Sequence, residues 1–598
     1  MVAALSVLFS PLQVRHSTLG MCLSESCLRY INKLESSMDL ELDPCQDFHA
    51  YVCSHWKPVA GGRSFLEDAV LDFQGKIAAQ VMAITAPKKN QNNLQKGASF
   101  YQSCVIKTDH GIHYLKDFLN MTGLTWPAVD VGHDPFRVLL DLSFEWRCPV
   151  FFYAYVSSGK ADNYRLHLMD MFMGIDFSAF VTEHRSRGGN VRHVCRLYEV
   201  LADVPDGTEV KNQHASLCHG IAQLQSYLID RLDVHEALGS ASYSNVDDFA
   251  LNTTPAISGE EWVRGIALNS LRGTSFSSRT PVDVKNPEYL MALTTILTDT
   301  PRENVLLFIG LTAIQAIGRF VSRQLAEIIY PDEWSVAQQR HYTVCCHMTD
   351  AAISGALSSS VTPYLFNDRR LRKMEEVARI VVGSSHQLLR QSAWLGPKSK
   401  QVVITKIARA ALLLGDQEID SEATENTPLE DMTDFLLHNV KSLPSDYWAR
   451  VFRRLKSTTI WTNPWHQANG SYAPSTLFIP DVYMLEGVFP DGAYESVYYA
   501  SVGSLIARQV SATYDLKGRT IDGDGKERPW LSLEEQLRQD RLIECLVKAF
   551  EHHYNGTEVT SDETKSALYV AWESLSPLLT ALQFSPGYPD YSAGFRNS

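Results

Sequence analysis

Long segments with apolar residues at mixed three- and four-residue spacing run through most of this chain and indicate a largely helical fold. Such spacing places apolar side chains along one face of an α-helix, where they can pack against a core. Pro301 and Pro397 interrupt runs that would otherwise be longer. Strand-like segments are few, and the clearest are 150–156 and 475–479. The expected helices are 65–84, 287–297, 302–329, 370–395, 398–414 and 534–553.

The organisation of these helices does not follow a simple series of domains. A chain of 598 residues would correspond to about four sequential domains of about 150 residues each. However, no internal repeat and no proline- or serine-rich linker separates such domains, which favours lobes built from discontinuous segments. The chain is 45% hydrophobic and 20% charged, a composition typical of globular proteins. Its net charge of −14 argues against a nucleic-acid backbone as the main partner.

Two apolar stretches bear on targeting and membrane association. Residues 2–12 are apolar but too short to span a bilayer, and no basic segment precedes them. Two interpretations of this start remain open: a signal peptide or anchor remnant within 1–21, or incidental hydrophobicity. Residues 305–317 contain Gln315 and are followed by Arg319, so we expect a buried helix there and not a membrane span.

The cysteines and glycosylation sequons point to an extracellular chain. Eleven cysteines occur and none forms a CxxC pair, which excludes zinc-ribbon and thioredoxin motifs. In an oxidising compartment an odd number leaves at least one thiol free or paired between molecules. N-glycosylation sequons begin at Asn120, Asn252, Asn469 and Asn555.

A specific family pattern opens the chain. The run Cys22-Leu-Ser-Glu-Ser-Cys27, followed by DPCQDFHAYVCSHW at 43–56, resembles the start of the ectodomain of the neprilysin and endothelin-converting-enzyme family of zinc metalloendopeptidases. Further segments are similar to the family in the same order, so that the resemblance spans 22–591. These segments are 286–290, 302–309, 394–406, 469–480, 499–503 and 515–524.

The resemblance implies a mainly α, two-lobed ectodomain, secreted or exposed at the plasma membrane. A thermolysin-like lobe is expected from 22–80 and 400–598, with a helical capping lobe from 81–399. Together the lobes of this family enclose a cavity that admits peptides. The family continues beyond the position of Ser598 with a transition-state histidine, a substrate-binding arginine and several cysteines. We therefore expect this chain to lack the C-terminal part of the first lobe.

The zinc-binding helix of the family has a defined chemistry. Two histidines one helical turn apart hold the metal, a glutamate beside the first activates water, and a second helix supplies a third ligand. Aligned by its flanks, the segment 502–515 has Arg508 and Ala512 at the histidine positions and Gln509 at the glutamate position. Arginine is a permanent cation, alanine has no donor atom, and glutamine cannot take a proton from water near neutral pH. We therefore expect no catalytic zinc and no other cofactor.

Other positions implied by the resemblance are mixed. Glu563 matches the third ligand, whereas Ala567 replaces an aspartate that orients a ligand histidine. Loss of such a supporting group typically costs about 10–100-fold in metal affinity or activity. Arg508 either pairs with Glu563 or turns to solvent. Asn469 and Gly470 match the pair that holds substrate, although a glycan on Asn469 would obstruct the cleft.

The resemblance also sharpens the cysteine count. It implies Cys22–Cys27 and Cys104–Cys345 disulfides, with Cys195–Cys218 as a third. His214, Cys218 and His219 have metal-like spacing, but a disulfide of Cys218 is the preferred interpretation. Five thiols then remain unassigned: Cys45, Cys53, Cys148, Cys346 and Cys545.

These observations predict a catalytically inactive family member that binds extracellular peptides or serves as a scaffold. One alternative is an active zinc metalloendopeptidase that cleaves extracellular peptides. A second alternative is a truncated gene product without function. No nucleic-acid partner is expected, and membrane association would require an N-terminal anchor.

Overall fold

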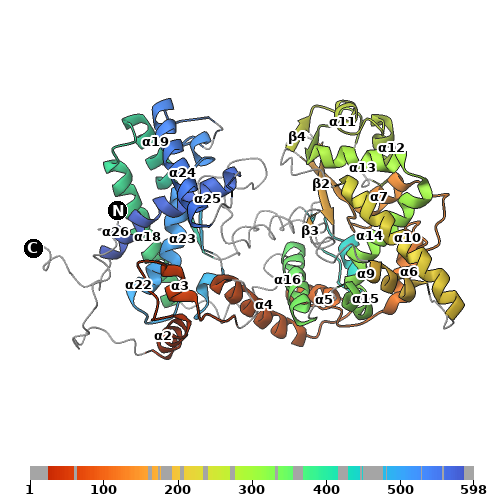
Figure 1. The fold of residues 1–598 in the computed structure, drawn as a ribbon, viewed down its shortest axis with the longest axis horizontal. Helices are drawn as coiled ribbons and strands as arrows, with labels where there is room; N and C mark the ends of the chain where they lie inside the picture. The colour runs from red at the N-terminus through yellow and green to blue at the C-terminus, as the bar shows by residue number, and fades with distance from the viewer. Residues whose placement is uncertain are drawn as a thin grey trace, which may run out of the picture. The chain divides into compact units, whose positions relative to one another are not determined.

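The chain forms two compact units, and helices dominate both (Figure 1). The first unit comprises 1–76, 361–423 and 457–598, and the second comprises 77–360 and 424–456. The computed structural model describes residues 24–58, 64–158, 164–172, 175–176, 191–202, 208–232, 240–269, 276–329, 334–353, 368–414, 429–444, 447–448, 476–479, 481–524, 526, 528–554, 558–559 and 561–584.

The first unit is built around helix α23, which packs against α18, α25, α26 and strand β7. Apolar side chains along these helices, among them Val381, Val502 and Ile506, form its buried core. Its helices are α2 (Glu25–Ser37), α3 (Phe48–Cys53), the start of α4 (Phe65–Ala83), α18 (Asp368–Gln391), α19 (Pro397–Ala408), η3 (Asp481–Met484), α22 (Glu495–Tyr498), η4 (Tyr499–Gly503), α23 (Ser504–Ala512), η5 (Gly518–Thr520), α24 (Leu533–His553), α25 (Asp562–Glu573) and α26 (Leu575–Gln583).

A two-stranded parallel sheet lies beside α23 in this unit. Strand β6 (Ala411–Leu414) pairs with β7 (Thr476–Ile479), with Leu413 opposite Phe478. The helix expected over 398–414 is therefore wrong at its end, because α19 stops at Ala408 and the chain turns into β6. The apolar run at 411–414 fits a buried helix and a buried strand equally well, and pairing with a distant segment selects the strand.

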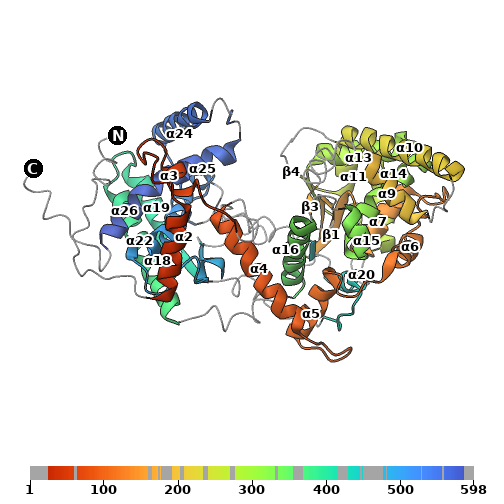
Figure 2. The ribbon, with the colours of Figure 1, turned by 60° about the horizontal axis from the view of Figure 1, so that its bottom comes forward.

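The other described helices lie in the second unit, and most of them are labelled in Figure 2. The expected helix over 302–329 divides at Gly318, because α14 ends at Ile317 and a short 3-10 turn precedes α15, which begins at Arg323. Its helices are α5 (Asn93–Cys104), α6 (Gly111–Met121), α7 (Pro135–Phe144), α9 (Val191–Leu201), α10 (Thr208–Leu232), α11 (Val246–Thr253), α12 (Gly259–Asn269), α13 (Pro287–Asp299), α14 (Arg302–Ile317), η1 (Gly318–Phe320), α15 (Arg323–Ile329), α16 (Trp334–Ala352) and α20 (Leu436–Lys441).

The stretch Arg302–Phe320 is long and apolar enough to cross a membrane, but 83% of its best window is buried inside the protein. Within α14, Val305, Ile309 and Ile314 are completely covered. The buried helix expected over 305–317 is therefore confirmed, since an interior helix of a globular unit is apolar on all sides.

The second unit also contains a mixed sheet, most of whose strands were not predicted from the sequence. Strand β1 (Phe152–Ser158) forms an antiparallel hairpin with β2 (Tyr164–Phe172). Strand β5 (Val282–Lys285) runs parallel to β2, and β4 (Ser240–Tyr243) is antiparallel to β5. The short β3 (Ile175–Asp176) pairs with the end of β2. Of these five, only β1 matches an expected strand.

The division into units differs from the one expected at sequence level. Helix α18 belongs to the first unit and not to a capping lobe, because Met374, Val377 and Val381 pack into the core around α23. Residues 424–456 belong to the second unit, although the resemblance implies that they lie in the first lobe.

The disulfides between described cysteines have the expected pairing. Cys104 on α5 is bonded to Cys345 on α16, and Cys195 on α9 is bonded to Cys218 on α10. Cys27 is also disulfide-bonded, whereas Cys22 lies outside the described residues. The free cysteines are Cys45, Cys53 and Cys545, which are exposed, and Cys148 and Cys346, which are buried.

Candidate functional site

The positions that correspond to the zinc-binding motif lie on the short helix α23. Arg508 and Ala512 are one helical turn apart, and Gln509 follows Arg508. Ile506, Ala507 and Val510 bury the other side of the helix in the core, and this burial sets the direction in which Arg508 and Ala512 point. The helix therefore has the geometry that a His-Glu-x-x-His motif requires, but with different side chains.

Both polar atoms of the Gln509 amide form hydrogen bonds with strand β7. The backbone N–H of Phe478 donates to Oε1 of Gln509 at 2.7 Å, and Nε2 of Gln509 donates to the carbonyl oxygen of Phe478 at 2.7 Å. The side chain is buried, so these bonds satisfy polar groups that water does not reach. A carboxylate could accept the first bond but could not donate the second. Gln509 thus acts as a clamp between α23 and β7, which the sequence did not reveal.

Arg508 is half-buried beside Tyr483 of η3. Burial lowers the pKa of the guanidinium, and the neighbouring Tyr483 opposes this effect. Burial also raises the pKa of Tyr483 to about 12, with Arg508 acting in the opposite direction. The cation therefore occupies the position where a metal ligand would stand. Glu563 lies on α25, but its side chain is outside the described part of the chain, so its ion pair with Arg508 stays a prediction.

The carbonyl end of α23 is held by one buried cation. Nζ of Lys406, on α19, donates to the carbonyl oxygens of Thr513, Gly518 and Ile521 at 2.5, 2.7 and 2.8 Å. Burial lowers the pKa of Lys406 to about 8, and two nearby aspartates oppose this shift. Gly518 is needed where this turn packs against the end of α23, because a Cβ there would lie 2.5 Å from the backbone oxygen of Ala512. The turn after the helix is thus locked by several contacts at once.

Asp515 links this turn to the helix that carries Glu563. Its carboxylate accepts hydrogen bonds from the backbone N–H groups of Lys517 and Gly518 and from the hydroxyl of Ser566 on α25, the last at 2.7 Å. Burial raises the pKa of Asp515, whereas these hydrogen bonds act to lower it. Ala567, beside Ser566, is exposed and has no polar group to orient a neighbour.

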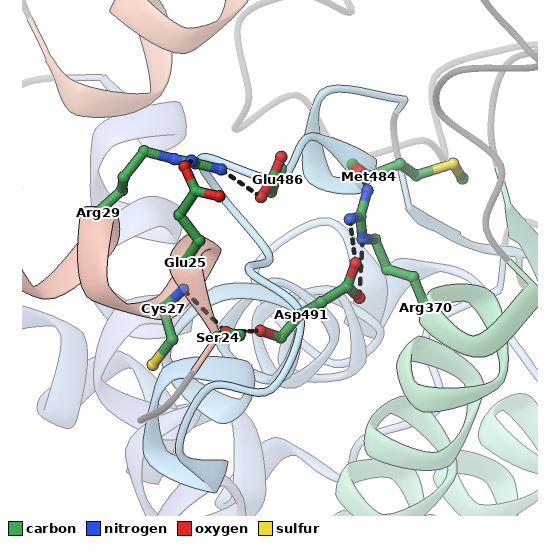
Figure 3. A network of polar contacts seen from close by, with 8 residues as sticks. All are labelled: Ser24, Glu25, Cys27, Arg29, Arg370, Met484, Glu486 and Asp491. Carbon is green, nitrogen blue, oxygen red and sulfur yellow. Dashed lines mark hydrogen bonds and ion pairs between the residues drawn. The ribbon is translucent and has the colours of Figure 1, made fainter. Parts of the chain in front are cut away.

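A second polar network holds the segment that leads into α23. Figure 3 shows Arg370 of α18 reaching Asp491, with Nη2 to Oδ2 at 2.5 Å, and the carbonyl oxygen of Met484 at 2.8 Å. The hydroxyl of Ser24 donates to the backbone carbonyl of Asp491, and Arg29 of α2 pairs with Glu486 at 2.7 Å. Since Arg370 and Asp491 are 121 residues apart, no local pattern could have indicated this contact.

The remaining predicted site residues are only partly described. Asn469, Gly470 and Asn555 lie outside the described residues. Asn120 on α6 and Asn252 on α11 are exposed, as glycan acceptors must be. Modification at all four sequons stays a prediction.

The donor set on α23 does not fit a zinc ion. Arg508 repels a cation, Ala512 has no lone pair, and the carbonyl oxygen of the Gln509 amide is already bound to Phe478. Over the described ranges, the one group of three metal-ligating side chains lies in the second unit, at Cys195, Cys218 and His219. We therefore derive no zinc-dependent step at α23. What this site offers chemically is a half-buried cation and a rigid framework.

Most of the chain is similar in sequence to known proteins. A family model described as peptidase family M13 matches residues 44–415. Endothelin-converting enzyme 1 from Homo sapiens is 21% identical over 612 residues, which covers 94% of this chain and 76% of that protein. Neprilysin-1 from Trittame loki is 19% identical over 589 residues, which covers 90% of this chain and 79% of that protein.

Two solved structures have a similar fold. The Mycobacterium tuberculosis zinc metalloprotease Zmp1 in complex with an inhibitor has a TM-score of 0.63 at 18% identity, covering 92% of this chain and 86% of that one. PepO from Lactobacillus rhamnosis HN001 has a TM-score of 0.65 at 15% identity, covering 92% and 87%. At such low identity the likeness concerns the fold, and it confirms the mainly helical architecture.

Proposed function

Because the chain belongs to peptidase family M13, we propose that it is a catalytically inactive member that binds extracellular peptides without cleaving them. The single observation that carries the inactive part of this proposal is the state of Gln509. Both polar atoms of its amide are bound to the backbone of Phe478, and an amide cannot take a proton from water, so the side chain at the predicted general-base position is held against β7 and is not a base.

The peptide-binding part rests on what surrounds α23. The Lys406 and Arg370 networks hold the helix and its approach in a defined geometry even though the ligand positions have changed. Such buried networks are costly when partly satisfied, and here their donors and acceptors are matched. The relative endothelin-converting enzyme 1 is named for converting endothelin, and the resemblance implies a cavity that admits peptides, so we infer a peptide ligand here.

An extracellular location is part of the same proposal. Disulfides such as Cys104–Cys345 form and persist in oxidising compartments. Exposed sequon asparagines at 120 and 252 are compatible with glycosylation on the secretory route.

The proposal is tested by measuring metal content and peptide cleavage of the full chain. We expect less than stoichiometric zinc by mass spectrometry and no cleavage of a quenched fluorescent peptide, with human endothelin-converting enzyme 1 and a family inhibitor as controls. Stoichiometric zinc with inhibitor-sensitive cleavage would show that the chain is an active metalloendopeptidase.

Binding is tested separately with the same peptide carrying one fluorophore. We expect saturable fluorescence anisotropy that an unlabelled copy competes away. Secretion and a cooperative melt are expected as well, since a non-functional product would aggregate or melt without a transition. No saturable binding by a well-folded sample would leave the inactive assignment in place but reject the peptide-binding role.

A further inference from the structure

Strand β4 (Ser240–Tyr243) is an edge strand of the mixed sheet in the second unit, where it lies beside α11 (Figure 1). One side of β4 pairs with β5, and no further described strand pairs with its other side. An edge strand presents backbone N–H and C=O groups that have no partner in the sheet. The free side of β4 is therefore a place where another extended segment can pair.

The hydrogen bonds between β2 and β5 determine how β5 is oriented toward β4. The backbone N–H of Leu166 on β2 donates to the carbonyl oxygen of Pro281 at 2.9 Å, and Leu166 lies opposite Val282. In this parallel register the backbone groups of Asp283 also point toward β2. Because successive residues of a strand alternate, Val282 and Val284 point their backbone groups toward β4.

This orientation leaves the backbone groups of Ser240 and Ser242 pointing away from the sheet. The two valines lie opposite Ala241 and Tyr243, so these residues of β4 bond to β5. Both serines are exposed, and their backbone groups form no hydrogen bond with any described residue. Proteins usually block such an edge with proline, lysine or a bulge, but β4 has none of these.

We propose that β4 binds an extended peptide as an additional antiparallel strand, held by the backbone groups of Ser240 and Ser242. In this kind of recognition, main-chain hydrogen bonds provide affinity and alternate side chains provide specificity. The strand has four residues, and at about 3.4 Å per residue its edge is short. It suits a peptide better than a second copy of the chain, because a stable dimer buries at least about 1,200 Å².

The face of the sheet that carries Ser242 favours a neutral polar residue in the peptide. Oγ of Ser242 donates to Oδ1 of Asp283 at 2.7 Å, and Nη1 of Arg165 donates to the same oxygen at 2.6 Å. Directly opposite residues of an antiparallel pair share a face, so the peptide residue opposite Ser242 lies beside this charge pair. Since the two charges already neutralise each other, a threonine fits better there than a charged residue.

The opposite face of β4 favours apolar residues. The rings of Tyr243 and Phe249, on α11, pack with their centroids 5.8 Å apart. The hydroxyl of Tyr243 accepts a hydrogen bond from Oγ1 of Thr253 at 2.5 Å, so its polar atom is already satisfied. Peptide residues beside Ala241 and Tyr243 would therefore contact an apolar surface. The expected ligand is a peptide in which polar and apolar residues alternate.

The first test measures fluorescence anisotropy with the full chain and a fluorescein-labelled peptide, Lys-Thr-Val-Thr-Val-Thr-Lys. We expect saturable binding. In antiparallel pairing, the threonines that face the same side as Ser242 direct their N–H groups at β4. N-methylation of the three threonines should weaken binding at least about tenfold, because these donors are lost. N-methylation of the two valines, whose N–H groups point away from β4, should change binding less than about twofold.

The second test changes β4 itself. Ser242→Pro removes the outward N–H without disturbing the bonds to β5, and it should weaken binding at least about fivefold. Ser242→Thr keeps the N–H and the hydroxyl group and is the matched control, which should bind as the parent chain does. Hydrogen exchange of the segment 240–243 should slow when the peptide is present. Unchanged melting temperatures of both variants exclude unfolding as the cause of weaker binding.

The proposal is overturned if the parent chain does not bind the peptide, or if the threonine-methylated peptide or Ser242→Pro gives unchanged affinity. Dimerisation of the parent chain that Ser242→Pro abolishes, measured by sedimentation, would assign this edge to a second copy and also overturn the proposal. The site belongs to the second unit and does not depend on the role proposed for α23. Zinc content and cleavage measure that role separately, so the two proposals fail independently.

Discussion

The middle of helix α23 and its two ends differ in the roles of their residues. In the middle lie Arg508, Gln509 and Ala512, which the resemblance aligns with the metal ligands and the general base of the family. At the ends, Lys406 holds the carbonyl groups after the helix, and Arg370 holds the segment before it. The centre therefore carries the residues predicted to replace the catalytic ones, whereas the framework around it is built from buried polar contacts.

This difference indicates that position and reactivity are separable properties of the site. The framework depends on buried donors and acceptors, whose loss destabilises the folded chain. The central residues contribute little to this stability, except for Gln509, which belongs to the framework through its hydrogen bonds with Phe478. The comparison therefore predicts large effects on stability at the ends, an intermediate effect at Gln509 and a small one at Arg508.

The largest effect is expected at Lys406. Lys406→Met should lower the free energy of unfolding by about 4 kcal/mol, because three buried carbonyl groups lose their common donor. Chemical denaturation followed by circular dichroism measures this loss. The exposed Lys398, on the same helix, is the matched control, and Lys398→Met should change stability little. Equal effects at both positions would remove the distinction between framework and surface.

The second effect concerns the segment before α23. Arg370→Met should cost about 3 kcal/mol, because it leaves Asp491 and the Met484 carbonyl without their buried donor. Arg372→Met, at an exposed position on α18, should be nearly silent in the same denaturation experiment. If Arg370→Met were also silent, the network in Figure 3 would not stabilise the approach to the helix.

A third prediction concerns the clamp and its pH dependence. Gln509→Glu should cost about 2 kcal/mol at neutral pH, because a carboxylate cannot donate to the Phe478 carbonyl. Only the protonated acid can donate there, so the folded chain raises the pKa of the new carboxyl above its ordinary value of about 4.3. The folded state then holds more protons than the unfolded state above that pH, and stability falls as pH rises.

Gln509→Met is the matched control for this prediction. It removes both hydrogen bonds without adding a titratable group, so its cost should not vary with pH beyond that of the parent chain. Melting temperatures of both variants between pH 4 and pH 8 separate the two cases. Parallel pH profiles would contradict the bidentate contact with Phe478.

The smallest effect is expected from Arg508 and Glu563. If the two form an ion pair, a double-mutant cycle with Arg508→Met and Glu563→Gln should give a coupling free energy of about 1 kcal/mol. The coupling should fall at high salt, because the half-buried Arg508 is still partly screened. A coupling of zero at low salt would favour the alternative in which Arg508 points to solvent.

The sequence predicted the helices better than the sheets, because helices depend on residues close together in the chain and sheets depend on distant segments. The α4 and α24 helices have apolar spacing that can be read within one segment, and both were predicted within a few residues. Strands β5 and β6 are four residues long and exist because a distant segment pairs with them. The end of the helix predicted over 398–414 failed for that reason.

The same contrast holds within the candidate site. The identities of Arg508, Gln509 and Ala512 could be compared with a known motif from the sequence alone, and the motif lies on a helix as expected. The partner of Gln509 could not be foreseen, because Phe478 is 31 residues away and contributes only backbone atoms. Backbone donors and acceptors are the same at every residue, so no sequence signal marks them.

By itself, the sequence determined the family and the helical class and predicted the loss of metal ligands at α23, because these properties reside in residue identity and local spacing. The tertiary structure alone decided that Gln509 closes onto β7, that Lys406 serves three carbonyl groups, and that the backbone groups of Ser240 and Ser242 point away from the sheet. Those facts depend on contacts between segments far apart in the chain. Burial turns such contacts into large energies, since a polar group removed from water must find its partner within the protein.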